Sequence, residues 1–167
     1  KLATITQTGV RRAEIKMGAR ILIIGAGPLG QLLTQYVKLM GAETIMIIDP
    51  IGSRLKVAQD HGATEIFDGS AADALPFVEE NTHGNLADVV FDATGHYSVF
   101  PMALKLTRRF GTLILIGDSP HPSKQILTAD VLTRQITVRG THNEVMPPHV
   151  EQWDTSRQIE LFHTFLK

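Results

Sequence analysis

The stretch from Arg20 to Asp49 constrains the fold more than any other part of this sequence. The apolar run Ile21–Ile24 leads into the turn Gly25-Ala26-Gly27-Pro28-Leu29-Gly30. Apolar residues at helical spacing follow the turn, and Gly41 ends that segment. A second apolar run then ends at Asp49. Strand, glycine turn, helix, strand and acid in this order predict a dinucleotide-binding βαβ unit.

Each residue type in the turn has a physical reason to be there. Gly25 allows a sharp turn off the strand, Gly27 lets a pyrophosphate approach the backbone, and Gly30 lets the helix pack closely on the sheet. Pro28 and Leu29 complete the turn, and the free amide groups and positive dipole end of the helix that follows attract phosphate. We therefore expect these five residues to bind the cofactor. The alternative interpretation is a structural turn in another α/β fold.

Asp49 follows the last glycine by about twenty residues, the spacing of the acid that accepts hydrogen bonds from a ribose diol. Its carboxylate would repel a 2′-phosphate and offers it no donor, so the sequence favours NAD over NADP. The alternative interpretation is a solvated acid at the end of a strand. Arg54 could compensate for that repulsion, but it lies one helical turn further on.

The rest of the chain alternates between strands and helices. Further strands are expected at Glu65–Phe67, Asp88–Asp92, Thr112–Ile116 and Ile136–Arg139, and an exposed loop at Asp118 to Lys124. Helices are expected over 2–14, from Ser53 to Gly62, over 70–82 and from Val99 to Leu106. A last helix carries Ile159, Phe162, Phe165 and Leu166 on one face, and we expect the part of that face formed by Phe162, Phe165 and Leu166 to be core rather than an interaction surface. Residues 1–167 are thus expected to form one α/β domain with a Rossmann fold, a doubly wound six-stranded parallel sheet in the order 3-2-1-4-5-6 with helices on both faces.

Charge and composition exclude several classes of function. The net charge is -1, and no aromatic residues interleave with the short basic pairs, so we expect no nucleic-acid partner. No apolar run could span a membrane, and the chain lacks cysteine. The histidines, among them His121, His142 and His149, lack the paired spacing of metal ligands, so no metal site is expected here. A soluble, cytoplasmic protein is the default expectation.

Several short motifs together resemble the cofactor domain of the zinc-type medium-chain dehydrogenases/reductases, which include alcohol, polyol and threonine dehydrogenases. The resemblance covers nearly the whole chain. Its motifs are Lys16-Met17-Gly18-Ala19-Arg20, the glycine turn, Gly62-Ala63-Thr64, Phe91-Asp92-Ala93-Thr94-Gly95, and Phe110-Gly111-Thr112, which is similar to the family's Gly-Gly-Thr.

The resemblance implies roles for residues along the cofactor. Asp49 would bind the adenosine ribose, Arg54 would lie over the adenine, and Thr94 and Gly95 would line the cofactor at the end of the fourth strand. Ile116 and Gly117 would flank the nicotinamide, and Thr141 and Asn143 would hold its carboxamide. His96, next to Gly95, would lie near the cofactor crevice, in contact with ribose or substrate or simply in solvent. Family members often pair through the sixth strand, so a homodimer or homotetramer is implied.

In that family a separate domain carries the catalytic zinc ligands and most of the substrate pocket. The resemblance therefore implies a piece of a larger enzyme, which binds NAD but contains no catalytic residue and does not turn over its alcohol or polyol by itself. Two alternatives remain open from the sequence. One is a non-catalytic NAD(H)-sensing module, and the other is a zinc-free medium-chain reductase acting on quinones or enones.

Overall fold

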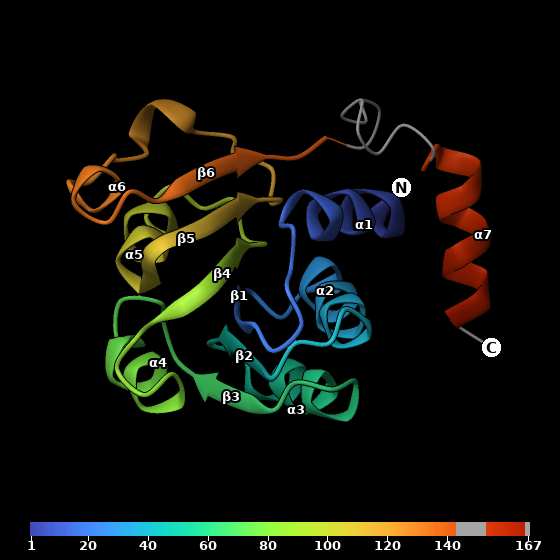
Figure 1. The fold of residues 1–167 in the computed structure, drawn as a ribbon, viewed down its shortest axis with the longest axis horizontal. Helices are drawn as coiled ribbons and strands as arrows, with labels where there is room; N and C mark the ends of the chain where they lie inside the picture. The colour runs from blue at the N-terminus through green and yellow to red at the C-terminus, as the bar shows by residue number, and fades with distance from the viewer. Residues whose placement is uncertain (143–152, 166–167) are drawn as a thin grey trace.

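The chain folds around one parallel sheet, as the sequence predicts. The structure, a computed structural model, describes residues 1–142 and 153–165. All strand pairs are parallel and the order β3-β2-β1-β4-β5-β6 confirms the Rossmann topology (Figure 1). The strands are β1 (Arg20–Ile24), β2 (Thr44–Asp49), β3 (Glu65–Asp68), β4 (Ala87–Asp92), β5 (Thr107–Leu115) and β6 (Thr137–Gly140). The helices are α1 (Leu2–Arg12), α2 (Pro28–Leu39), α3 (Gly52–Asp60), α4 (Leu75–Asn81), α5 (Val99–Leu106), η1 (Pro122–Lys124), α6 (Asp130–Thr133) and α7 (Thr155–Phe165).

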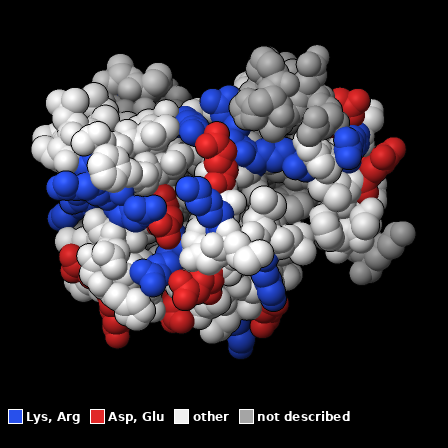
Figure 2. All heavy atoms as spheres, in the orientation of Figure 1, with Lys and Arg blue, Asp and Glu red and all other residues white. Residues whose placement is uncertain are grey.

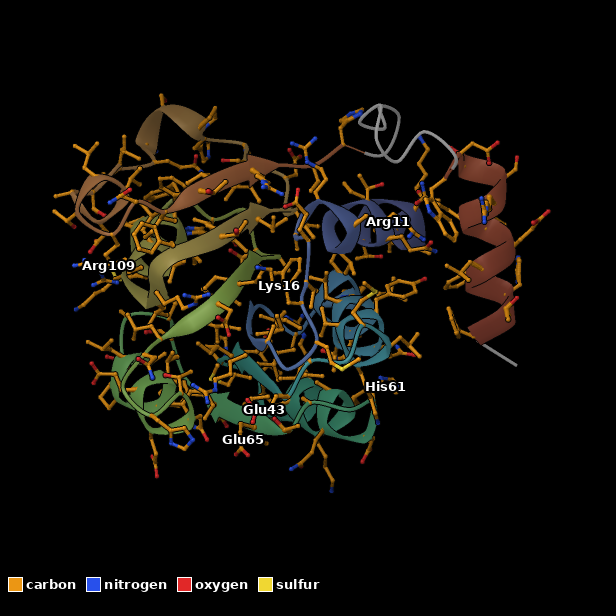
Figure 3. All side chains as sticks on the ribbon, viewed as in Figure 1. Arg11, Lys16, Glu43, His61, Glu65 and Arg109 are labelled. Carbon is orange, nitrogen blue, oxygen red and sulfur yellow. The ribbon has the colours of Figure 1, made fainter. Side chains whose placement is uncertain are left out.

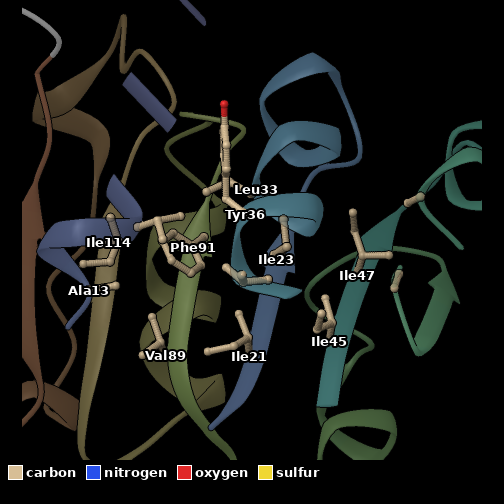
Figure 4. Close-up of a cluster of buried hydrophobic side chains, with 14 of the residues drawn as sticks. Ala13, Ile21, Ile23, Leu33, Tyr36, Ile45, Ile47, Val89, Phe91 and Ile114 are labelled. Atoms are coloured by element: carbon tan, nitrogen blue, oxygen red, sulfur yellow. The ribbon is translucent and has the colours of Figure 1, made fainter. Parts of the chain in front are cut away.

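The two faces of the sheet bury separate hydrophobic clusters, because successive strand residues point to opposite sides. Ile21 and Ile23 belong to the cluster covered by α1, α2 and α3, which Figure 4 shows with Phe91 and Leu33. Their neighbour Leu22 belongs to the cluster covered by α4 and α5. Continuous apolar runs in the sequence therefore correspond to strands covered on both faces.

Several element boundaries differ from the sequence prediction. The helix expected over 70–82 begins only at Leu75, since Pro76 lacks an amide hydrogen and fits the first helical turn. The fifth strand begins earlier than expected, and its pairing with β4 shifts register between Ala87 and Val89 of β4. The loop from Asp118 to Lys124 includes the short helix η1, and the four-residue α6 was not expected. None of these changes alters the topology.

The last helix packs differently from the prediction. Ile159 is 43% and Phe165 46% exposed, while Gln158 is fully buried. Leu166 lies outside the described residues. The prediction of a core face was wrong for Phe165, and Phe162 is only half-buried, because Gln158 is the residue that α7 buries against the body of the domain.

The contacts of α7 with the body are largely polar. The side-chain amide of Gln7 donates to the Tyr36 hydroxyl at 3.1 Å and to the Gln158 carbonyl at 2.8 Å. The guanidinium of Arg11 lies 3.5 Å from the ring centre of Trp153, and burial lowers the pKa of Arg11. Two apolar hollows of about 210 and 200 Å³ remain beneath α7, both lined by Phe165. The interface between α7 and the body is therefore loosely packed.

Charges of both signs alternate over the face shown in Figure 2. Arginines lie next to carboxylates in the pairs Arg20–Glu43 (3.4 Å), Arg134–Asp130 (3.2 Å) and Arg139–Glu14 (2.7 Å). Within residues 1–142 and 153–165, every helix is too short or too polar to cross a bilayer. The outer edge of β6 is open in this structure, and pairing of two copies through it stays a prediction.

Phe110 adopts a backbone conformation that side chains disfavour. Its φ is +59° and it is 62% exposed, so no packing of its ring accounts for this conformation. A left-handed conformation costs a residue with a Cβ about 1–2 kcal/mol, while glycine loses more entropy on folding.

We expect Phe110→Gly to raise the free energy of unfolding by about 0.5–1 kcal/mol relative to Phe110→Ala. The alanine variant is the matched control, because it loses the same ring but keeps the strained Cβ. Urea unfolding of both variants measures the difference. An alanine variant as stable as the glycine variant would show that the backbone here is not strained.

Candidate cofactor-binding site

The glycine turn connects β1 to α2 through one residue with positive φ and one close backbone approach. Gly25 has a φ of +100° and donates its amide hydrogen to the Ile48 carbonyl at 2.8 Å. A Cβ on Gly30 would lie 1.9 Å from the Gly25 carbonyl oxygen. Backbone atoms cannot move aside as a flexible side chain can, so helix and turn fit together only with glycine at position 30.

Gly27 faces open space at the start of α2. It is the N-cap of that helix, without a side-chain capping bond, and a Cβ placed on it would meet nothing within 4 Å. Pro28 is exposed beside it, and Leu29 is half-buried against the core. The first amide groups of a helix have no partner within the helix. An open cradle beside them fits a phosphate group.

Asp49 stabilises the turn, a role that the sequence analysis missed. Its side chain is nearly fully buried, and it accepts hydrogen bonds from the amides of Ala26 (2.8 Å) and Ile51 (2.9 Å). The half-exposed guanidinium of Arg54 lies 3.7 Å from the same carboxylate. The structure thus brings Asp49 and Arg54 together directly beside the glycine turn.

An open groove of about 390 Å³ runs between the glycine turn and α3. Its lining residues are Ala26, Gly27, Pro28, Gln31, Ser53, Arg54 and Val57. The Gln31 side-chain amide donates to the carbonyls of Ala26 (3.0 Å) and Arg54 (2.9 Å), so it joins the turn to the start of α3. No sequence signal marked Gln31, because its partners are backbone atoms that only the tertiary structure brings together.

The turn after β4 is organised by the buried carboxylate of Asp92. One oxygen, Oδ1, accepts hydrogen bonds from the Thr94 amide (2.9 Å), the Thr94 hydroxyl (2.7 Å) and the Gly95 amide (3.2 Å). These contacts fix Thr94 and Gly95 at the carboxyl end of β4, beside the end of β1.

The ends of β5 and β6 complete this edge of the sheet. The amides of Ile116 and Gly117 both donate to the Asp92 carbonyl at 3.0 Å. Thr141 is fixed by its amide and hydroxyl, which donate to the Leu115 carbonyl at 3.2 and 3.0 Å. The structure therefore places all the expected cofactor residues that it describes along one edge, while Asn143 lies outside the described residues.

Metal ligands do not gather in the part of the chain that the structure describes. No group of three or more histidine, aspartate or glutamate side chains there is placed to hold an ion. His149 lies outside the described residues.

A parallel sheet with this glycine turn and a groove at its carboxyl edge defines a nucleotide-binding Rossmann domain. The chain belongs to the zinc-binding dehydrogenase family, whose pattern it matches over residues 28–155. It corresponds to the cofactor-binding domain of the zinc-type medium-chain dehydrogenases.

Two similar proteins are named as dehydrogenases of substrates that carry hydroxyl groups. The chain is 29% identical to L-threonine 3-dehydrogenase of Bacillus licheniformis, covering 85% of this chain and 39% of that protein. It is 32% identical to sorbitol dehydrogenase 1 of Saccharomyces cerevisiae, covering 63% of this chain and 31% of that protein.

A solved structure shares the fold. It is a putative zinc-binding dehydrogenase from Sinorhizobium meliloti 1021 bound to NADP, with a TM-score of 0.79 and 26% identity over 84% of this chain and 42% of that one. The chain thus spans about two-fifths or less of the length of these relatives.

Proposed function

We propose that this chain is the NAD-binding part of a zinc-dependent dehydrogenase that transfers hydride between an alcohol or polyol and NAD. The observation that carries the proposal is the open cradle at Gly27 beside the buried carboxylate of Asp49. The names of the similar proteins support an alcohol or polyol as substrate and favour an enzyme over a sensing module.

The chain's own residues would bind and orient the cofactor. The turn Gly25, Gly27, Pro28, Leu29 and Gly30 would hold the pyrophosphate. Asp49 would accept the ribose hydroxyls and Arg54 would cover the adenine. Towards the nicotinamide, the contacts would come from Thr94, Gly95, Ile116, Gly117, Thr141 and Asn143.

The reaction chemistry would come from bound groups. A nicotinamide cofactor supplies the hydride acceptor when it is bound, and the protein supplies orientation and exclusion of water. Zinc would polarise the substrate oxygen and would be held by residues outside this chain. We therefore propose that the chain by itself binds cofactor without turnover.

The choice of NAD over NADP depends on two neighbouring charges. Asp49 disfavours a 2′-phosphate, but the guanidinium of Arg54 lies 3.7 Å from that carboxylate and could attract one. The structure of the Sinorhizobium protein was solved with NADP, which supports NADP as the alternative cofactor. We favour NAD because Asp49 is buried and held by two backbone amides, whereas the side chain of Arg54 is half-exposed.

Titration of the chain with NADH and NADPH, followed by nicotinamide fluorescence, tests the proposal. We expect NADH to bind about tenfold more tightly, a difference of about 1.4 kcal/mol. Asp49→Asn should narrow that gap while keeping one acceptor oxygen for the turn, which Asp49→Ala would lose. Glu65→Gln is the matched control, because Glu65 (labelled in Figure 3) is the first residue of β3, whereas the groove lies at the carboxyl edge of the sheet. It should change neither affinity. Failure of both cofactors to bind at millimolar concentration would contradict the proposal.

A further inference from the structure

The loops after β4 and β5 are joined by a very close backbone approach. A Cβ on Gly95 would lie 1.7 Å from the Asp118 carbonyl oxygen, and one on Gly117 would lie 2.2 Å from the Gly95 nitrogen. Because both positions are glycine, the two loops can touch at the carboxyl edge of the sheet. This contact brings the residues that follow Gly95 next to those that follow Gly117.

Four side chains from these loops form what we call the rim cluster, His96, Tyr97, His121 and Lys124. The ring of Tyr97 stacks on His96 with centres 4.5 Å apart and meets the edge of His121 at 6.4 Å. The ammonium of Lys124 lies 5.4 Å from the centre of the Tyr97 ring. These residues could not be grouped from the sequence, since 25 positions separate His96 from His121.

The rim cluster is held in place by local hydrogen bonds. The Lys124 amide donates to the His121 carbonyl at 3.0 Å, which closes η1. The Gln125 side-chain amide donates to the Ser119 hydroxyl at 3.1 Å and so ties the loop to itself. On the other loop, the Nδ1 atom of His96 is 2.8 Å from the Ser98 hydroxyl at the start of α5. The cluster is therefore built on two braced loops.

The charge of the rim cluster is not neutralised by ion pairs. Within residues 1–142 and 153–165, neither Lys124 nor the two histidines form an ion pair with a carboxylate. Asp118 is the one acidic residue in the segments 93–98 and 117–125. An ammonium and imidazoles around an aromatic ring offer hydrogen-bond donors and positive charge, which carboxylates and phosphates bind well.

We propose that the rim cluster binds an anionic group, a carboxylate or a phosphate, on the alcohol substrate. This inference depends on the proposed function, because it places the nicotinamide beside Ile116 and Gly117, next to the cluster. The substrate would then be a hydroxy acid or a phosphorylated polyol, and Lys124 would distinguish it from a neutral alcohol.

NMR titration of the 167-residue chain with small probes tests the inference without turnover. Glycerol 3-phosphate and D-glycerate carry the two candidate anions, and glycerol is the uncharged control. We expect both anions to shift the imidazole signals of His96 and His121 and to bind at least tenfold more tightly than glycerol. Lys124→Gln should weaken the binding of glycerol 3-phosphate at least fivefold.

Lys105→Gln is the matched control. This exposed lysine lies in the last turn of α5, at the opposite end of the helix from Ser98, which contacts the rim cluster through His96. It should leave the affinity for glycerol 3-phosphate unchanged. Equal binding of all three probes, or no binding of the anions, would overturn the inference. NADH binding of the same sample tests the proposed function separately. If the chain binds NADH but binds the three probes equally, the anion site is overturned and the proposed function is not.

The phosphate of the cofactor itself is the competing source of an anion. It is distinguished by the affinities for NADH and for NADPH, both of which Lys124→Gln should leave unchanged. A loss of affinity for either cofactor would assign the rim cluster to the cofactor and overturn its role towards substrate.

Discussion

Gly30→Ala is expected to destabilise the chain by about 3 kcal/mol or more, enough to unfold a domain of marginal stability. The new Cβ would lie 1.9 Å from the Gly25 carbonyl oxygen, so either α2 must move off the sheet or the turn must change shape. Both would disturb the core, because Leu33 on the same helix is fully buried. Circular dichroism during urea unfolding measures the loss.

Gly27→Ala is the matched control, because it adds the same methyl group only three residues away. Gly27 has a φ of -69° and nothing within 4 Å of its missing Cβ, so the variant should keep its stability. The methyl group would nevertheless occupy the cradle that we assign to pyrophosphate, and NADH affinity should fall at least tenfold, by about 1.4 kcal/mol. Normal NADH binding by Gly27→Ala would contradict the assignment of the pyrophosphate to this turn. Normal stability of Gly30→Ala would contradict the claim that helix and turn fit together only with glycine at position 30.

Asp92→Ala is expected to cost about 3 kcal/mol of unfolding free energy, because three buried or half-buried donors lose their acceptor. The donors are the amide and hydroxyl of Thr94 and the amide of Gly95, and Asp92 itself is only 1% exposed. The same change should loosen the turn that lies beside the expected cofactor. Urea unfolding measures the stability.

Asp92→Asn separates the hydrogen bonds from the charge. All three donors reach Oδ1, and an asparagine oxygen can occupy that position, so we expect a loss of only about 1 kcal/mol. An asparagine variant as unstable as the alanine variant would mean that the negative charge, and not the acceptor oxygen, stabilises the turn.

The fold could be predicted from the sequence because its signals are local and repeated. The apolar run Ile21–Ile24 corresponds to a buried strand, Gly25 to a turn residue with positive φ, and Gly30 to a close backbone approach. Boundaries were less certain where local rules compete, as at Pro76, which both breaks helices and begins them. The buried face of α7 was mispredicted because amphipathic spacing cannot reveal that Gln158 has polar partners inside.

The site could be predicted only for those residues whose type and spacing alone indicate their role. Glycine and aspartate at fixed spacing indicate a dinucleotide site, and the structure places them together. The bracing by Gln31 and the rim cluster depend on contacts between loops distant in sequence. Without the tertiary structure, a histidine such as His96 has the same appearance as any solvent-exposed histidine.

The loose packing beneath α7 divides the chain into parts of unequal local stability. Breaking the contacts of α7 would expose few large apolar side chains, since Phe165 is already half-exposed and hollows lie beneath it. Opening the sheet would instead expose residues such as Phe91 and Leu33, which are fully buried. Local unfolding of α7 therefore requires less free energy than global unfolding. We therefore expect α7 to detach and return as a separate cooperative unit while the glycine turn and the carboxyl edge of the sheet keep their shape.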